Sequence, residues 1–233
     1  MSTGDDLMTV LQRCGTFTLM NESPNHDHLI WREIDRRPLL DAPIFQVYSS
    51  RRRAADGKES EYILIDSPDW CNVIAPVSRD DGVACFVMAQ QYRHGSRTVS
   101  VEFPGGLVDE GEKPEAAALR ELEEETGFTA ERLRLIGRVN PNPAFMSNTA
   151  FTYFAEGARF AGEQSLDENE RLDAVLVPIE EITEFVRPDF HVHAIMMSAL
   201  YWYRVFQGDG LEYDERMEKW EARQSNAATG PLH

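Results

Sequence analysis

Three closely spaced glutamates after a glycine-rich turn are the residues of this sequence best suited to chemistry. Glu121, Glu124 and Glu125 lie in a segment rich in Ala, Leu, Glu and Arg, which are good helix formers. On a helix, positions i, i+3 and i+4 bring these carboxylates to one patch. Grouped carboxylates raise one another's pKa unless cations lie between them. Oxygen ligands of this kind suit Mg²⁺ or Mn²⁺ shared with substrate phosphates, so the segment predicts a divalent-metal site that holds a phosphate chain.

The residues around these glutamates set the limits of the helix. Pro114 suits the first helical position and Gly127 suits the position just past the end, so we expect a helix over residues 115–126. Arg120 stands four residues before Glu124 and can orient its carboxylate. The alternative interpretation is a solvated acidic helix, since the chain contains 40 Asp and Glu residues.

The complete pattern from Gly106 to Phe128 reads G-x5-E-x7-R-E-L-x-E-E-x-G-F and resembles the Nudix box at every fixed position. Nudix enzymes hydrolyse nucleoside diphosphates linked to another moiety, with metal bound on this loop–helix–loop. The resemblance implies two overlapping sets of residues. The metal ligands would be Gly105 (through its carbonyl), Glu121, Glu124 and Glu125, and the catalytic set would be Glu121 with Glu112 and Arg120, which brace the loop.

Segments outside the box are similar to the ADP-ribose pyrophosphatase branch of the family. They are Gln91-Tyr92-Arg93 and the run from Glu102 to Gly106, and the similarity extends over residues of about 45–205. The resemblance implies that Arg93 binds the pyrophosphate and that Glu102 faces the substrate or orients the box. It also implies that Glu168 is the general base and Glu170 a further metal ligand on a closing loop. The chain departs from the branch at residues 187–193, which replace a G-x-I-x-D-x-K-T segment.

Each of these residues also has a plain interpretation. Arg93 and Glu102 would then be exposed side chains of strands, and the acidic loop around Glu168 an ordinary solvated turn. Phe145, on a loop with Pro and Asn, is a candidate to stack on a base, although a core position fits it as well. His191 and His193 stand two residues apart and would not share a helix face, so we interpret them as structural histidines.

Length and composition limit the class of protein. The chain has 233 residues, of which 42% are hydrophobic and 27% charged, which is typical of one globular domain with an extension. A formal charge of −17 argues against nucleic acid or an anionic membrane as a partner. The odd number of cysteines, without metal-ligand spacing, favours a reducing cytosol, and no apolar run reaches the length of a membrane span.

The order of elements predicts an α/β fold, and the resemblance implies the α/β/α sandwich of Nudix proteins with a mixed sheet. Apolar alternation predicts hairpins over residues 45–65 and 71–89, and further strands over 98–103, 132–139, 149–155 and 174–177. A second helix is expected over residues 191–206. We expect residues 1–43 to be a small extension, 44–208 the Nudix domain, and 209–233 a charged tail with at least its last ten residues mobile. By resemblance, the extension contributes to a homodimer.

The expected activity is metal-dependent hydrolysis of ADP-ribose to AMP and ribose 5-phosphate in the cytoplasm. Another nucleotide sugar, such as GDP-mannose or ADP-glucose, is an open alternative because substrate choice depends on loops. A non-catalytic Nudix sensor is a second alternative, which the intact carboxylates disfavour. Isomerisation of an isoprenoid diphosphate is a third; it needs an acid/base cysteine, and no cysteine lies near the box in the sequence.

Overall fold

The computed structural model describes residues 26–184 and 187–229, the last of these (223–229) by backbone alone. Expectations for residues 1–25, which include Cys14, lie outside the described residues.

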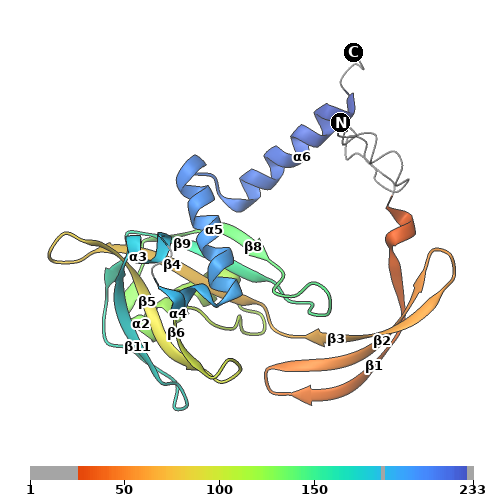
Figure 1. The fold of residues 1–233 in the computed structure, drawn as a ribbon, viewed down its shortest axis with the longest axis horizontal. Coiled ribbons are helices and arrows are strands. Elements are labelled where there is room, and N and C mark those ends of the chain that lie inside the picture. Colours follow the sequence, from red (N-terminus) through yellow and green to blue (C-terminus); the bar gives the residue numbers. More distant parts are fainter. Residues whose placement is uncertain (1–25, 185–186, 230–233) are drawn as a thin grey trace, which may run out of the picture.

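A six-stranded mixed sheet forms the centre of the molecule (Figure 1). Its strands run in the order β11-β5-β4-β9-β8, and β6 pairs with β5. β4 and β9 are parallel and the other neighbours antiparallel, which confirms the mixed sheet. The strands are β4 (Trp70–Ser78), β5 (Ala84–Arg93), β6 (Thr98–Glu102), β8 (Arg132–Val139), β9 (Ala150–Glu156) and β11 (Leu172–Pro178), and a separate short ribbon joins β7 (Phe128–Thr129) to β10 (Arg159–Phe160).

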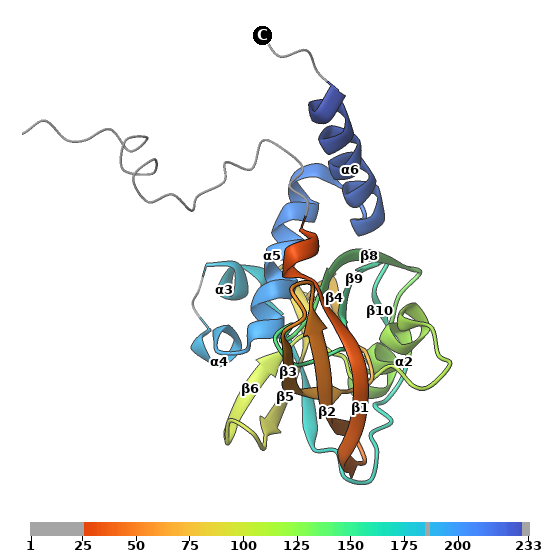
Figure 2. The same ribbon diagram turned by 90° about the vertical axis from the view of Figure 1, so that its right-hand side faces the viewer.

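Helices cover both faces of this sheet (Figure 2). Successive side chains of a strand point to opposite faces, so Val73 packs with Leu122 in one core and Ile74 packs with Phe190 in the other. One face carries α2 (Pro114–Thr126), and the other carries α3 (Ile179–Thr183), α4 (Pro188–His191) and α5 (Ala194–Asp209). The expected α/β/α sandwich is therefore confirmed, and α4 and α5 replace the single helix expected over residues 191–206.

A second, three-stranded sheet stands beside the first (Figure 1). It consists of β1 (Trp31–Ala42), β2 (Phe45–Ala54) and β3 (Glu59–Asp66), preceded by the short 3-10 helix η1 (Asp27–Leu29). The expected boundary between residues 43 and 44 falls in the turn between β1 and β2, which pair along their length. The sheet meets the main domain where the Ile65 N–H donates to the Phe145 carbonyl (2.7 Å) and the Ile65 carbonyl accepts from the Ser147 N–H (3.1 Å).

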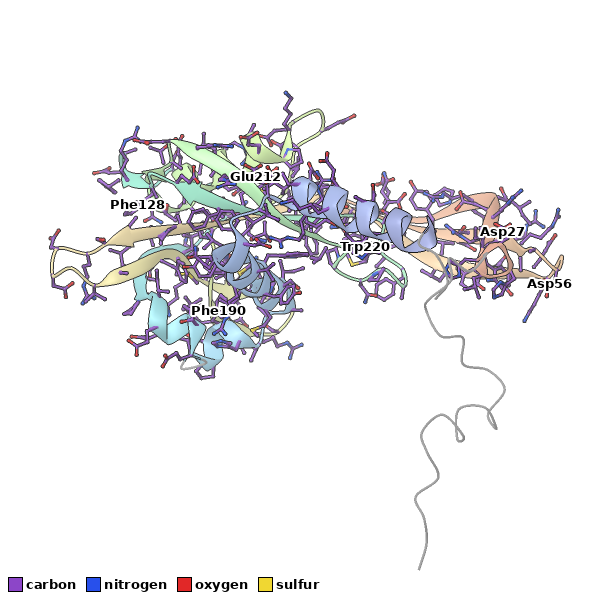
Figure 3. All side chains as sticks on the ribbon, turned by 90° about the horizontal axis from the view of Figure 1, so that it is seen from above. Asp27, Asp56, Phe128, Phe190, Glu212 and Trp220 are labelled. Atoms are coloured by element: carbon purple, nitrogen blue, oxygen red, sulfur yellow. The ribbon has the colours of Figure 1, made fainter. Side chains whose placement is uncertain are left out.

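The charged C-terminal segment contains a helix where the sequence suggested only a charged tail. α6 (Tyr213–Thr229) includes residues 224–229, while residues 230–233 lie outside the described part. Its start is fixed because Arg134 binds Glu212 (2.9 Å) and Tyr213 packs on Trp202 (ring centroids 5.5 Å apart). From there the helix projects toward the side that carries the β1–β3 sheet (Figure 3). None of the helices in the described residues is long and apolar enough to span a membrane.

Candidate active site

A glycine turn between β6 and α2 holds the candidate site against the sheet. The Cys71 and Val73 N–H groups of β4 donate to the carbonyls of Gly106 and Pro104, both at 2.9 Å. A Cβ on Gly105 would collide with the Cys71 carbonyl, and one on Gly106 would lie 2.5 Å from Glu121 Oε1. Gly105 therefore has to be glycine, because the backbone of β4 leaves no room for a side chain, whereas a side chain at position 106 would displace the Glu121 carboxylate.

Helix α2 begins at Pro114 and ends at Thr126, and Gly127 just past its end adopts the left-handed conformation, so the expected start and stop signals are confirmed. Arg120 on this helix binds three carboxylates at once. It donates to Glu112 (3.0 and 3.2 Å), Glu121 (2.9 Å) and Glu124 (3.0 Å). The hydrogen bonds from Arg120 lower the pKa of Glu112. Arg120 thus ties the turn to the helix and supports two of the proposed metal ligands.

Glu125 is the most deeply buried carboxylate of the box, with 4% of the residue exposed. It accepts a hydrogen bond from the Gly105 N–H at 2.8 Å. Burial, with smaller contributions from Glu121 and Glu170, raises the pKa of Glu125 to about 8. Burial also raises the pKa of Glu121, and the charges of Glu124 and Glu170 add to the rise. Negative charge on these two carboxylates is therefore disfavoured unless a cation lies beside them.

The donor set fits a divalent cation. Carboxylate oxygens of Glu121, Glu124, Glu125 and Glu170, together with the Gly105 carbonyl, are the hard ligands that Mg²⁺ prefers. Within the part of the chain that the structure describes, no three acidic, His or Cys side chains already converge as a metal site. Instead Arg120 and the Gly105 N–H bind these carboxylates. Burial, and to a smaller extent repulsion between the carboxylates, raises the pKa of Glu121 and Glu125, and a bound cation would stabilise their charged forms.

The acidic loop before β11 lies on the same side of the sheet as the box. Glu170 is close enough for its charge to raise the pKa of both Glu121 and Glu125. Its carboxylate accepts from the Asp167 N–H (3.0 Å), which folds the loop into a turn. Glu168 is exposed and lines a cavity of about 760 Å³ together with Glu170 and with Gln91 of β5.

Arg93 and Glu102 form a bidentate ion pair beside the glycine turn. Arg93 Nε donates to Glu102 Oε1 (2.8 Å) and Nη2 donates to Oε2 (2.6 Å). Burial alone would raise the pKa of Glu102, but Arg93 and the Ser100 hydroxyl outweigh it and lower the pKa below its ordinary value. The plain interpretation of Glu102 as an exposed strand residue is wrong, since only 1% of it is exposed.

A second cavity, of about 420 Å³, lies between the β1–β3 sheet and the loop after β8. Phe145 lines it, as do Trp31 and Tyr62, whose rings meet edge to face with centroids 5.6 Å apart. Sequence reasoning did not find Tyr62 or Arg36, which line the cavity together with Arg52. The sequence does show aromatic and arginine residues in these segments. They meet at one cavity only because the strands pair, which the sequence alone does not reveal.

Cys71 is close to the box in space, although it is far from it in sequence. Its thiol donates to the Gly106 carbonyl with a sulfur–oxygen distance of 3.7 Å. Burial raises the pKa of Cys71 to about 12, so the thiol stays protonated. A cysteine therefore does lie near the box in the folded chain, contrary to what the sequence suggested. Because its thiol stays protonated, Cys71 is a poor proton acceptor at neutral pH.

Comparison with known proteins places the site in a family. The model of the NUDIX domain matches residues 71–199, a range that contains the glycine turn, α2 and the acidic loop. The chain belongs to the Nudix family. As the sequence predicted, it is a Nudix pyrophosphohydrolase, and the fold of that family is confirmed.

Individual relatives of this Nudix chain are similar over much of their length. It is 30% identical to the "ADP-ribose pyrophosphatase" of Bacillus subtilis (strain 168) over 66% of this chain and 82% of that protein. It is also 30% identical to the "Methanol dehydrogenase activator" of Bacillus methanolicus, over 57% of this chain and 70% of that protein. A crystal structure of an "ADP compounds hydrolase" superposes with a TM-score of 0.65 at 25% identity, covering 77% of this chain and 96% of that one.

Proposed function

We propose that this Nudix enzyme hydrolyses the pyrophosphate bond of a nucleoside diphosphate sugar, with ADP-ribose cleaved to AMP and ribose 5-phosphate. The observation that carries the proposal is the group of carboxylates around the Gly105–Gly106 turn, in which Glu125 is buried and bound by the Gly105 N–H, with Arg93 beside it. The relative named ADP-ribose pyrophosphatase supports this choice of substrate.

The residues of the chain take distinct roles in this proposal. Glu121, Glu124, Glu125, Glu170 and the Gly105 carbonyl would hold Mg²⁺, with Mn²⁺ as a substitute. A bound cation supplies neutralisation of the diphosphate and a lowered pKa for water. Arg93 grips phosphate oxygens, for which a guanidinium offers paired N–H donors. Glu112 and Arg120 keep the loop in place, and Glu168, exposed on the acidic loop, accepts the proton of the attacking water.

The nucleoside end of the substrate is assigned to the second cavity. Trp31, Tyr62 and Phe145 supply aromatic rings on which a base stacks, and Arg36 and Arg52 supply donors for phosphate or ribose oxygens. This assignment accounts for the position of the β1–β3 sheet, because the sheet provides most of the aromatic lining.

A homodimer is part of the proposal. Nearly all of β1 is exposed, and residues of this sheet region such as Leu40 and Ile44 leave more than half of their surface in solvent. An exposed edge strand is a template for pairing with another chain. We propose that a second copy covers this surface, and that neither nucleic acid nor a membrane is a partner of a chain with a net charge of −17.

Release of AMP from ADP-ribose tests the proposal. We expect turnover in Mg²⁺, loss of turnover in EDTA, and recovery when Mg²⁺ or Mn²⁺ is added in excess. ADP-glucose and GDP-mannose, assayed in parallel, decide between ADP-ribose and the other nucleotide sugars. Absence of turnover with every nucleotide diphosphate in Mg²⁺ would reject hydrolysis and favour a sensing role.

A further inference from the structure

The first turn of α5 contacts the end of β6, directly before the glycine turn. The Phe103 N–H donates to the sulfur of Met196 at 3.1 Å. His193, the residue that caps α5, places its Nε2 3.6 Å from Glu102 Oε2. Helix α5 thus touches both residues that lead into Pro104 and Gly105, whose N–H in turn supports Glu125.

Glu102 links His193 to Arg93. Its carboxylate is buried, accepts two hydrogen bonds from Arg93 and accepts another from the Ser100 hydroxyl. A buried ion pair is favourable only when its geometry is well maintained, because both charges have lost their hydration. Any group that confines the Glu102 carboxylate therefore also confines the guanidinium bound to it.

Arg93 keeps donors available for a phosphate. The pair with Glu102 uses Nε and Nη2, whereas a guanidinium has five N–H donors in one plane. The Arg93 side chain is 42% exposed, in contrast to its buried partner. The plane of the Glu102 carboxylate thus sets the direction in which the remaining donors of Arg93 point.

His193 has the properties of a rigid support for that carboxylate. Its side chain is 29% exposed, and its buried Nδ1 lacks a hydrogen-bond partner among the described residues. Burial lowers the pKa of His193; the charge of Glu102 opposes this effect in part, and Arg93 adds a smaller lowering. At 3.6 Å the contact of Nε2 with Glu102 is longer than a hydrogen bond, so the ring confines the carboxylate by packing, and Arg93 supplies the countercharge for Glu102.

Charged neighbours on the same segment have other partners. Asp189 of α4 is bound by Arg187 (2.6 and 3.0 Å), and the ring nitrogens of His191 lie 2.6 and 3.1 Å from the carbonyls of Arg187 and Ile182. Hence His191 fits the structural role that the sequence suggested, whereas His193 faces the candidate site.

We propose that His193 is a positioning residue: it holds Glu102 so that Arg93 presents its free N–H donors to the diphosphate of the substrate. The inference rests on the proposed function for the identity of that ligand. It rests on the contacts above for the connection from His193 through Glu102 to Arg93.

Kinetics of substituted enzymes test this role. We expect His193→Ala to raise KM for ADP-ribose by about tenfold while kcat changes less than about twofold, the signature of lost binding common to ground and transition states. His193→Gln, which keeps a polar side chain of similar reach, should restore most of the affinity. Val192→Ala is the matched control, because Val192 is 73% exposed, and should leave KM unchanged.

A double-mutant cycle separates positioning from a general loss of structure. In an Arg93→Ala background, His193→Ala should raise KM no further, because its effect passes through Arg93. Additive effects of the two substitutions, or an unchanged KM in His193→Ala, would overturn the proposal.

A measurement without turnover keeps this inference distinct from the proposed activity. The ¹⁵N NMR signal of the Arg93 Nε–H, assigned with Arg93→Lys, should be sharp in the wild type and broadened in His193→Ala but not in Val192→Ala. An unaltered signal in His193→Ala rejects the positioning role. Failure of the wild type to hydrolyse any nucleotide diphosphate rejects the proposed function instead, and the NMR result still decides whether His193 holds the pair.

Discussion

At the scale of single residues, burial decides how the carboxylates of the box behave. Glu125 combines the least exposure with the strongest rise in pKa, and the Gly105 N–H fixes its position. Replacement by Gln keeps the shape and removes the charge. We expect Glu125→Gln to reduce kcat by more than about a hundredfold, since mutating residues that only support metal ligands already lowers metal affinity or activity by up to that factor. Circular dichroism should show a retained fold, and activity within tenfold of wild type would contradict the metal assignment.

The raised pKa of Glu125 also predicts how stability depends on pH. Because the folded-state pKa of about 8 lies above the ordinary value of 4.5, the folded protein holds a proton that the unfolded chain has lost between these values. The stabilisation is complete below pH 4.5 and is lost as the pH rises through 8. In EDTA, the melting temperature should therefore fall over this range, and less so in Glu125→Gln. Added Mg²⁺ should raise it more at pH 8 than at pH 5; equal shifts would contradict the assignment.

Gly106 offers a test that leaves every ionisable group in place. A methyl group there would press on the Glu121 carboxylate, which burial and Arg120 already confine. We expect Gly106→Ala to lower kcat at least tenfold by displacing that ligand, an effect like that of altering a ligand's supporting residues. Gly95→Ala, where a Cβ meets no atom within 4 Å, is the control and should keep full activity. Equal activity of both variants would show that Glu121 has room to move.

The sequence predicted the part of the site that lies within one segment. Helical spacing alone joins Arg120 to Glu124, and the glycines mark the turn. Contacts between distant segments could not be predicted from the sequence. Nothing in the local pattern around His193 indicates that α5 reaches Glu102, and nothing around Cys71 indicates that β4 lies under Gly106. Such contacts depend on how the sheet brings distant strands together.

At the scale of elements, the close packing of α5 on β8 depends on Gly137. A Cβ at this position would overlap the Trp202 ring. Inserting a methyl group into a packed interface forces side chains and backbone to shift, so we expect Gly137→Ala to destabilise the fold by about 1–3 kcal/mol. Urea unfolding measures the change. Gly208→Ala, in α5 with open space around it, should be neutral or slightly stabilising. A Gly137→Ala variant as stable as wild type would mean that α5 can move away from β8.

Elements were predictable where burial imposes a pattern. The hairpin strands β2–β3 and β4–β5, the strand β8 and the helix α2 were expected close to their observed limits. β1 was missed because only its two end residues are even partly buried, so its polar sequence shows no alternation. α6 was missed because few of its residues pack on the main domain, and its charged sequence is as typical of a solvated tail as of a helix.

At the scale of the whole molecule, the exposed β1–β3 sheet makes oligomeric state a direct test. Light scattering at micromolar concentration should give a mass twice that of one chain. Leu40→Lys, which places a charge on β1 where Leu40 is 53% exposed, should shift the protein toward the monomer without unfolding it. Lys58→Ala, in the β2–β3 turn, serves as a control and should remain dimeric. A wild-type monomer would remove the dimer from the proposal.

The protonated state of Cys71 bears on how the molecule withstands oxidative stress. Peroxides and alkylating reagents attack the thiolate, which Cys71 forms very little below its pKa of about 12. The Cys71 sulfur beneath the glycine turn therefore reacts slowly with these reagents. Maleimide dyes can therefore be attached through engineered surface cysteines while Cys71, beneath the candidate site, stays unmodified.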